Sequence, residues 1–302
     1  MSWLFFAFSG PILWAISTHL DKYLVERYFK HSSVAVLLVF TSLIGLLLLP
    51  FIWVYQPGVA ALSLQSILVI VFSGILYMEA MYFYLRALQS EEASIVAPFF
   101  QAAPLFGYAL GYIVLGETLS PTQLLGGILI IGGTLLLSVG SELHKTRYKA
   151  RLIVLMLACA FSLALSSVIF KLFAIRDEYW ITTFWTFVGE AVFGLGILAI
   201  TTYRSQFFAL LRSNTAAVLT LNGANELINL GGGLGVRYAL VLAPLSLVQA
   251  IGSTSSLFVF IFGIALSVFF PALGRENLSG RNLMQKGVSA VLIVLGVILI
   301  NR

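Results

Sequence analysis

The sequence predicts an all-α integral membrane protein with ten transmembrane helices, arranged as two inverted five-helix repeats. Composition is the first of three observations behind this prediction. Of the 302 residues, 60% are hydrophobic and only 10% are charged, and the mean hydropathy is +1.02. A soluble domain carries about 25% charged residues. The other two observations are a series of apolar stretches and a faint internal repeat.

Each apolar stretch has about the length of a membrane-spanning helix. Roughly 20 apolar residues cross the hydrocarbon core as an α-helix, and the bilayer requires the backbone to pair its own polar groups. The stretches lie near 3–23, 33–55, 64–88, 93–115, 121–140, 151–173, 180–203, 214–240, 243–270 and 284–301. The links between them are short, so we expect consecutive helices to run antiparallel as neighbours.

The second half of the chain resembles the first half in three places, in the same order. Residues 84–113 align with 236–265 at an offset of 152. Ala15, Ser17 and Lys22 align with Ala164, Ser166 and Lys171 at an offset of 149. The third match pairs Glu117-Thr118-Leu119-Ser120 with Glu276-Asn277-Leu278-Ser279. An odd number of helices in each repeat gives the halves opposite orientations, which is typical of secondary transporters with a midplane site. A duplication kept only for packing is the alternative.

Several motifs give the chain a resemblance to a known family. They are Ala-Leu at 87–88, Ser-Ile-Val-Ala-Pro at 94–98, Leu-Gly-Glu-Thr-Leu-Ser at 115–120 and Gln-Leu-Leu-Gly-Gly at 123–127. With ten helices in two repeats, they resemble the EamA family of the drug/metabolite transporter superfamily. The resemblance is clearest over 84–135. The second half departs from this pattern, because Ala250 occupies the position equivalent to Pro98.

The resemblance implies two EamA-like repeats, at 1–145 and, inverted, at 150–302. It implies a small-molecule carrier, commonly an exporter of amino acids or other metabolites, while some relatives move lipid-linked sugars. We therefore expect a secondary transporter that exports a small polar or amphipathic solute by alternating access. A flippase for a lipid or lipid-linked sugar is the alternative, and a membrane enzyme or non-transporting receptor is a more remote one.

The eighth apolar stretch carries the densest set of polar residues. Asn222, Asn225, Glu226 and Asn229 occupy positions i, i+3, i+4 and i+7, which share one face of a helix. Ionisable groups inside a membrane are costly and commonly mark a substrate or proton path. Residues 231–233 are three consecutive glycines, so we expect the helix to break there and expose backbone groups to a cavity. Helix–helix adhesion through the amides is the other interpretation.

Further polar residues on four other helices complete the predicted site. The fourth and ninth stretches carry a symmetric stripe that contains Gln101 and Tyr108 in one and Gln249 and Ser253 in the other. The predicted substrate-binding residues are Trp14, Glu79, Tyr82, Gln101, Tyr108, Trp185, Asn222, Asn225, Glu226, Asn229, Gln249 and Ser253. The candidates for proton coupling are Glu226, Glu79 and Glu190, because a carboxyl removed from water can bind and release a proton near neutral pH.

Basic residues are divided unevenly between the two ends of the predicted helices. Links after odd-numbered helices, with the adjoining helix ends, hold 13 of the 17 Lys and Arg, and the other side holds 4, including Lys171 and Arg237. The positive-inside rule then places both termini outside the cytoplasm, whereas the family resemblance implies the reverse. We expect Lys22 and Lys171 to extend to the interface, with a role in binding an anionic substrate left open. Glu117 and Glu276 are expected to cap the helices that follow them.

The sequence contains no Walker motif, no His/Cys metal cluster and no G-x-S-x-G nucleophile elbow. We therefore expect no cofactor, no metal and no enzymatic activity. The pI of about 9.3 is explained by loops that bind anionic headgroups, so no nucleic-acid partner is predicted. The expected partners are a small-molecule substrate and the lipid bilayer, in a monomer or homodimer. The expected location is the cell (inner) membrane, as a multi-pass protein.

Overall fold

The computed structural model describes residues 2–27, 33–90, 97–138, 150–213, 218–269 and 280–301, and each regular element within these ranges is a helix. Six helices are long and apolar enough to cross a membrane: Trp3–Leu20, Ala35–Tyr55, Leu64–Ala87, Ala150–Arg176, Tyr179–Ala199 and Leu245–Ala265. Shorter apolar helices cover Phe99–Leu115, Pro121–Leu136 and Met284–Ile300. The protein is thus an all-α, multi-pass membrane protein, while ten spans in inverted repeats stay a prediction.

The helices follow the predicted stretches closely. In the first half they are α1 (Ser2–Arg27), α2 (Val34–Ile44), α3 (Leu49–Tyr55), α4 (Leu64–Ser90), α6 (Ala102–Leu115) and α7 (Pro121–Ser138). In the second half they are α8 (Ala150–Arg176), α9 (Tyr179–Ala199), α10 (Thr201–Ser213), α12 (Gly223–Leu242), α13 (Leu245–Gly252), α14 (Ser255–Phe269) and α15 (Gly280–Ile300).

Four predicted spans contain irregular backbone. A 3₁₀ turn at Gly45–Leu47 separates α2 from α3, and a turn at 253–254 separates α13 from α14. A 3₁₀ segment at Ala97–Gln101 precedes α6, where Pro98 removes a backbone donor. A short π-helix, η5 (Val218–Asn222), precedes α12. Such departures from α-helix in a membrane protein are tolerated where the backbone is covered by protein or lines a polar space.

Helix α10 was not predicted from the sequence. It lies between α9 and η5 and carries Arg204 and Arg212 on one side, while Phe207 and Leu210 are buried against α2 and α9. A short amphipathic helix with basic residues is typical of a helix that lies along the membrane interface. The hydropathy pattern left most of this helix in the link between the stretches at 180–203 and 214–240.

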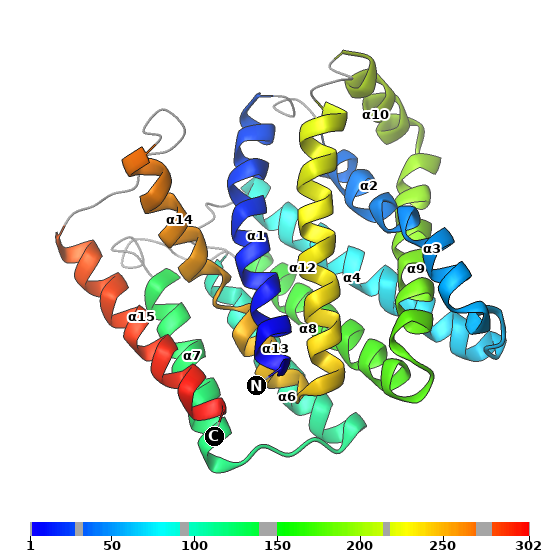
Figure 1. The fold of residues 1–302 in the computed structure, drawn as a ribbon. Helices are drawn as coiled ribbons and strands as arrows, with labels where there is room; N and C mark the ends of the chain where they lie inside the picture. Colours follow the sequence, from blue (N-terminus) through cyan, green and yellow to red (C-terminus); the bar gives the residue numbers. More distant parts are fainter. Residues whose placement is uncertain are drawn as a thin grey trace.

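The long helices pair across the two halves of the chain. Helix α1 lies along α12, α4 packs against both α8 and α9, and α7 lies along α15. Figure 1 shows α1 beside α12 in the centre of the view, α7 beside α15 at one edge, and both termini at the same end of the bundle. Large apolar side chains remain on the outer surface, among them Phe5, Val54 and Ile113, each more than 70% exposed. An apolar outer surface is the one that lipid tails cover.

Two helix-capping motifs stabilise the link between α6 and α7. Gly116 ends α6 in the left-handed region, with φ of 66°, and the Glu117 N–H bonds the Gly111 carbonyl at 3.1 Å, as in a Schellman cap. Ser120 and Gln123 then form a capping box at the start of α7, with bonds of 3.0 and 3.2 Å. Ser120 therefore caps α7, and the side chain of Glu117 is free for contacts elsewhere.

Candidate functional site

The polar face of the eighth stretch is buried inside the bundle. Asn225 is fully buried, and Asn222 and Glu226 are 3% and 5% exposed, while Asn229 is half-buried one turn further on. Thr41, on α2, donates a hydrogen bond of 2.8 Å to the Glu226 carboxylate. The contact joins the first half of the chain to the second. A carboxyl group and three amides therefore lie along one helix within an otherwise apolar protein.

A buried ion pair lies further along the same helix. Arg237, on α12, donates from Nη2 to Oε1 of Glu190 on α9. The Glu190 side chain is 6% exposed and that of Arg237 is 14% exposed. The guanidinium lies 4.9 Å from the ring centre of Phe187, 5.6 Å from Tyr77 and 5.8 Å from Phe170. Four helices, α4, α8, α9 and α12, thus surround one positive charge.

Tyr77 lies near both acidic groups. Its hydroxyl lies within electrostatic reach of Glu190, Arg237 and Glu226. Glu226 and Arg237 are eleven residues apart, a spacing of about three turns that places them on one face of α12. We therefore define the α12 site as Thr41, Tyr77, Glu190, Glu226 and Arg237. It contains two acids and one base, which can bind a charged solute or exchange a proton.

Sequence reasoning missed Arg237 as a site residue. It was counted as a basic residue at a helix end, yet α12 continues to Leu242 and encloses it. The eleven-residue spacing from Glu226 is the signal that could have placed it on the polar face. Lys171 is also buried, so neither residue is an exposed interfacial charge.

The prediction that the glycine run breaks α12 is wrong. The helix is continuous from Gly223 to Leu242. Gly232 packs directly against Trp14 and the backbone of Gly10 on α1, and a side chain at position 235 would collide with Ser9. The glycines therefore allow α1 and α12 to approach closely, as small residues do between membrane helices. The irregular backbone lies at the start of the polar face, in η5, which ends at Asn222.

The predicted stripe on the fourth and ninth stretches is divided by irregular backbone. Gln101 is 4% exposed and accepts a hydrogen bond from Thr134 on α7 at 3.1 Å, whereas Tyr108 is 41% exposed. The stripe assumed 3.6 residues per turn, and the 3₁₀ segment that ends at Gln101 has about three. In the ninth stretch, Gln249 packs against Gly107, and the Ser253 hydroxyl bonds the Ala250 carbonyl in the turn between α13 and α14.

The remaining predicted residues lie apart from the α12 site. Trp185, on α9, donates from Nε1 to the Val59 carbonyl at 2.9 Å. Tyr82 lies 5.7 Å beneath the Arg86 guanidinium. Glu79 is half-buried on α4, and within the described ranges it forms no hydrogen bond or ion pair. The structure brings together Glu226, Glu190 and the asparagines of α12, with Trp14 alongside.

A second buried ion pair lies at one end of the bundle. Lys171 on α8 pairs with Glu117 Oε1 and donates to the Ala243 carbonyl. Oε2 of Glu117 accepts a bond of 2.8 Å from the N–H of Leu245, the first residue of α13. The expectation that Lys171 extends to the interface is wrong, since the residue is 5% exposed. Glu117 caps α13 rather than α7. The Lys22 side chain and Glu276 lie outside the described residues.

A cavity of about 460 Å³ lies beside this second pair. Glu117, Lys171 and the backbone of residues 243–244 form its polar side. Its apolar side includes Leu172, Ile175 and Leu242, which are each at least 40% exposed. The cavity therefore opens to the outer surface of the bundle.

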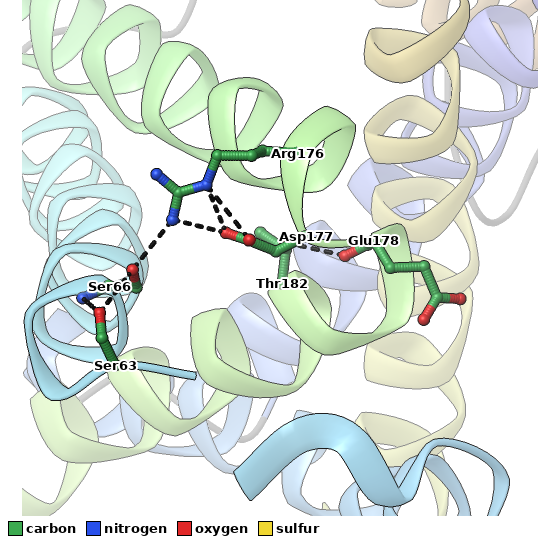
Figure 2. Close-up of polar contacts among 6 residues, drawn as sticks. All are labelled: Ser63, Ser66, Arg176, Asp177, Glu178 and Thr182. Atoms are coloured by element: carbon green, nitrogen blue, oxygen red, sulfur yellow. Dashed lines mark hydrogen bonds and ion pairs between the residues drawn. The ribbon is translucent and has the colours of Figure 1, made fainter. Parts of the chain in front are cut away.

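The same end of the protein also holds an exposed polar junction, which Figure 2 shows. Arg176, at the end of α8, donates to both carboxylate oxygens of Asp177 at 3.2 and 3.0 Å, and to Ser66 on α4 at 3.0 Å. The Thr182 hydroxyl bonds the Glu178 carbonyl at 2.9 Å at the start of α9. The Arg176 side chain is 58% exposed, so this junction is solvated and joins helices at the surface.

Within the part of the chain that the structure describes, no group of three or more His, Cys, Asp or Glu side chains is arranged to hold a metal ion. The α12 site offers a guanidinium, carboxylates and hydroxyls, and the asparagines beside it add amides. These groups suit an organic solute with charged or polar substituents.

Comparison with known proteins finds a family match for the first part of the chain. Residues 1–139 match the model of the EamA-like transporter family, which confirms the resemblance over those residues. A protein known from a crystal structure has the same fold, with a TM-score of 0.66 and 16% sequence identity over 99% of this chain and 96% of the other. At this identity the similarity shows the fold alone. No curated protein sequence matches the chain significantly.

Proposed function

We propose, from the membership of residues 1–139 in the EamA-like transporter family, that this protein is a secondary transporter that exports a small metabolite by alternating access. The substrate class we favour is an amino acid or a similar polar or amphipathic solute. The site is the α12 site, with Asn222, Asn225 and Asn229 beside it. We expect the protein to reside in the cell membrane and to use no cofactor.

One observation carries this proposal: charged groups are buried at the junction of the two halves of the chain. Glu226 contacts Thr41, and Arg237 contacts Tyr77, so each charge of α12 meets a residue of the first half. Burying charges without a functional need is costly, and intramembrane charges mark ion or substrate paths. Carriers built from two repeats place their substrates at such a junction.

The pairing of helices supports an inverted repeat. If each helix of the first half corresponds to one in the second, the α1–α12 contact corresponds to the α8–α4 contact. Under the same correspondence, α7 is equivalent to α15 and α2 to α9, so each of these two contacts joins a helix to its own counterpart. The correspondence is incomplete. Helix α4 packs closely on α9, whereas the equivalent helices α12 and α2 meet over a smaller surface, and among the described residues the contact of α8 with α9 has no comparable contact of α1 with α2. Unequal packing of equivalent pairs is what one state of an alternating-access carrier would have.

Proton coupling is the second part of the proposal, with Glu226 as its first candidate. Its carboxyl is 5% exposed and receives a hydrogen bond from an uncharged hydroxyl. Glu190 is already paired with Arg237, and Glu79 lies half-buried apart from both. Glu226 can therefore gain or lose a proton without first breaking an ion pair with Arg237.

Reconstitution into liposomes tests the proposal. A panel of radiolabelled amino acids, sugars and lipid-linked sugars is presented to protein-containing and protein-free vesicles at several pH gradients. We expect saturable, protein-dependent flux of at least one solute, with a rate that changes with the gradient. The absence of both binding and flux across the whole panel would refute the transporter proposal.

The alternative, a flippase for a lipid or lipid-linked sugar, is favoured by one observation. The cavity of about 460 Å³ beside Glu117 and Lys171 is bordered by exposed apolar side chains, as a groove for an acyl or prenyl chain would be. A lipid-flipping assay on the same vesicles separates the alternatives. Flipping of fluorescent lipids without solute flux would favour the flippase.

A further inference from the structure

The guanidinium of Arg237 has hydrogen-bonding capacity that the protein does not use. A guanidinium carries five N–H donors. The structure gives it one bond, from Nη2 to Glu190, and no other acceptor among the described residues. Its side chain is nevertheless 14% exposed, so part of the group faces space that a small molecule can reach. The N–H groups that do not bond Glu190 are therefore available to an acceptor that reaches this edge, and a hydrogen bond from a charged donor is a strong one.

The surroundings of Arg237 leave its edge open for such an acceptor. Phe187, Tyr77 and Phe170 lie within 4.9–5.8 Å of the guanidinium carbon, close enough to stabilise the cation through their ring faces. Ring faces stabilise the charge without saturating the in-plane N–H groups. A planar fork of donors matches the two oxygens of a carboxylate, which is why arginine binds carboxylates in a bidentate manner.

We infer that Arg237 binds the carboxylate of an organic-acid substrate, and that Glu190 takes the place of that carboxylate when the site is empty. The inference rests on the proposed function and names a substrate class for the same site: a small organic carboxylate. Phe187 and Phe170 are 1% and 2% exposed, so these rings hold the guanidinium in place. The Glu190 side chain is an internal competitor, because it already presents a carboxylate to the guanidinium.

The inference makes the two members of one ion pair behave in opposite ways. Replacing Arg237 by Gln removes the receptor, so carboxylate affinity falls by at least about tenfold, as expected for the loss of a charged hydrogen bond. Replacing Glu190 by Gln removes the competitor, so affinity rises, by about tenfold if the pair occupies the guanidinium nine-tenths of the time. If the ion pair served only to hold α9 against α12, the two substitutions would not change carboxylate affinity in opposite directions.

The test measures thermal unfolding of purified protein in detergent with three probes. These are 3-phenylpropionate, its uncharged amide, and inorganic phosphate. We expect the acid to raise the unfolding temperature in a concentration-dependent way, the amide to have a much smaller effect, and phosphate to have none. The response should vanish in Arg237→Gln and occur at lower concentrations in Glu190→Gln. Glu178→Gln, at the exposed junction, is the matched control and should respond like the wild type.

Each outcome bears on the inference. Equal stabilisation by acid and amide, a response to phosphate alone, or an unchanged response in Arg237→Gln would overturn it. If either variant does not fold, the comparison of acid with amide on the wild-type protein still decides whether the site selects a carboxylate. Binding of the acid, with no flux of the acid or of any solute in the panel, would count against the transporter proposal and leave the anion site standing. Flux of neutral solutes alone, without binding of the acid, would support the transporter proposal and refute the anion site.

Discussion

Two buried ion pairs differ in how completely the protein satisfies them. At the end of the bundle, Lys171 and Glu117 bond each other, and each also bonds the backbone of the α12–α13 link. In the middle, Glu190 and Arg237 bond each other, while aromatic rings surround the guanidinium. Both pairs are largely buried, but only the first has a backbone partner for each member.

We expect this difference to separate a structural pair from one that binds a solute. A charge whose hydrogen bonds are all taken by the protein gains little from a ligand, whereas a charge with open donors gains much. The first pair joins α8, the α6–α7 link and the start of α13. The second joins α9 to α12 at the level where the two halves of the chain meet.

The largest effect on stability is expected from Lys171→Met. The change leaves Glu117 buried without its cation, and removing one member of a buried pair costs about 3–5 kcal/mol. The free energy of unfolding in detergent, measured by denaturant titration, should fall by that amount. Loss of less than about 1 kcal/mol, the range of surface pairs, would remove the distinction between the two pairs.

A smaller effect is expected at the asparagines beside the α12 site. Asn225→Ala and Asn229→Ala each remove a side-chain amide from the polar face of α12. If these amides bind the substrate, each variant should weaken binding by about 1 kcal/mol, or roughly fivefold. Substrate affinity from concentration-dependent flux is the measurement. An unchanged affinity in both variants would assign the amides to helix packing alone.

The smallest effect is expected from Arg176→Gln. This side chain is 58% exposed and its ion pair with Asp177 joins adjacent residues at the surface. Exposed pairs contribute about 0–1 kcal/mol, and less at high salt. The unfolding free energy should therefore change little, and the small change should decrease further in concentrated salt. A loss as large as that of Lys171→Met would show that exposure does not distinguish these pairs.

The sequence predicted the helices well because apolar length leaves a strong signal. The stretch at 151–173 corresponds to α8, Ala150–Arg176, and the stretch at 180–203 contains α9, Tyr179–Ala199. The signal failed where a short amphipathic helix adjoined a span, as at α10. It also could not show that α2 and α3, or α13 and α14, are separate helices, because composition alone does not report a turn inside an apolar run.

From the sequence, the candidate site could be predicted only for residues that lie on the same helix. The spacing of Asn222, Asn225, Glu226 and Asn229 gives a shared face by helical geometry. The pairing of Glu190 with Arg237 joins residues 47 positions apart and depends on how α9 packs on α12. The partner of Lys171 is 54 positions earlier in the chain, 171 minus 117, and required the folded α6–α7 link. Neither contact leaves a local pattern.

The most direct measurement of the central claim is proton-dependent flux by Glu226→Gln in liposomes. Glutamine keeps the shape and the bond with Thr41 but cannot ionise. We expect normal folding, an unfolding temperature close to that of the wild type, and loss of most transport, while the exposed control Glu178→Gln transports normally. Transport by Glu226→Gln at the wild-type rate with unchanged pH dependence would contradict the claim that α12 carries the coupling group.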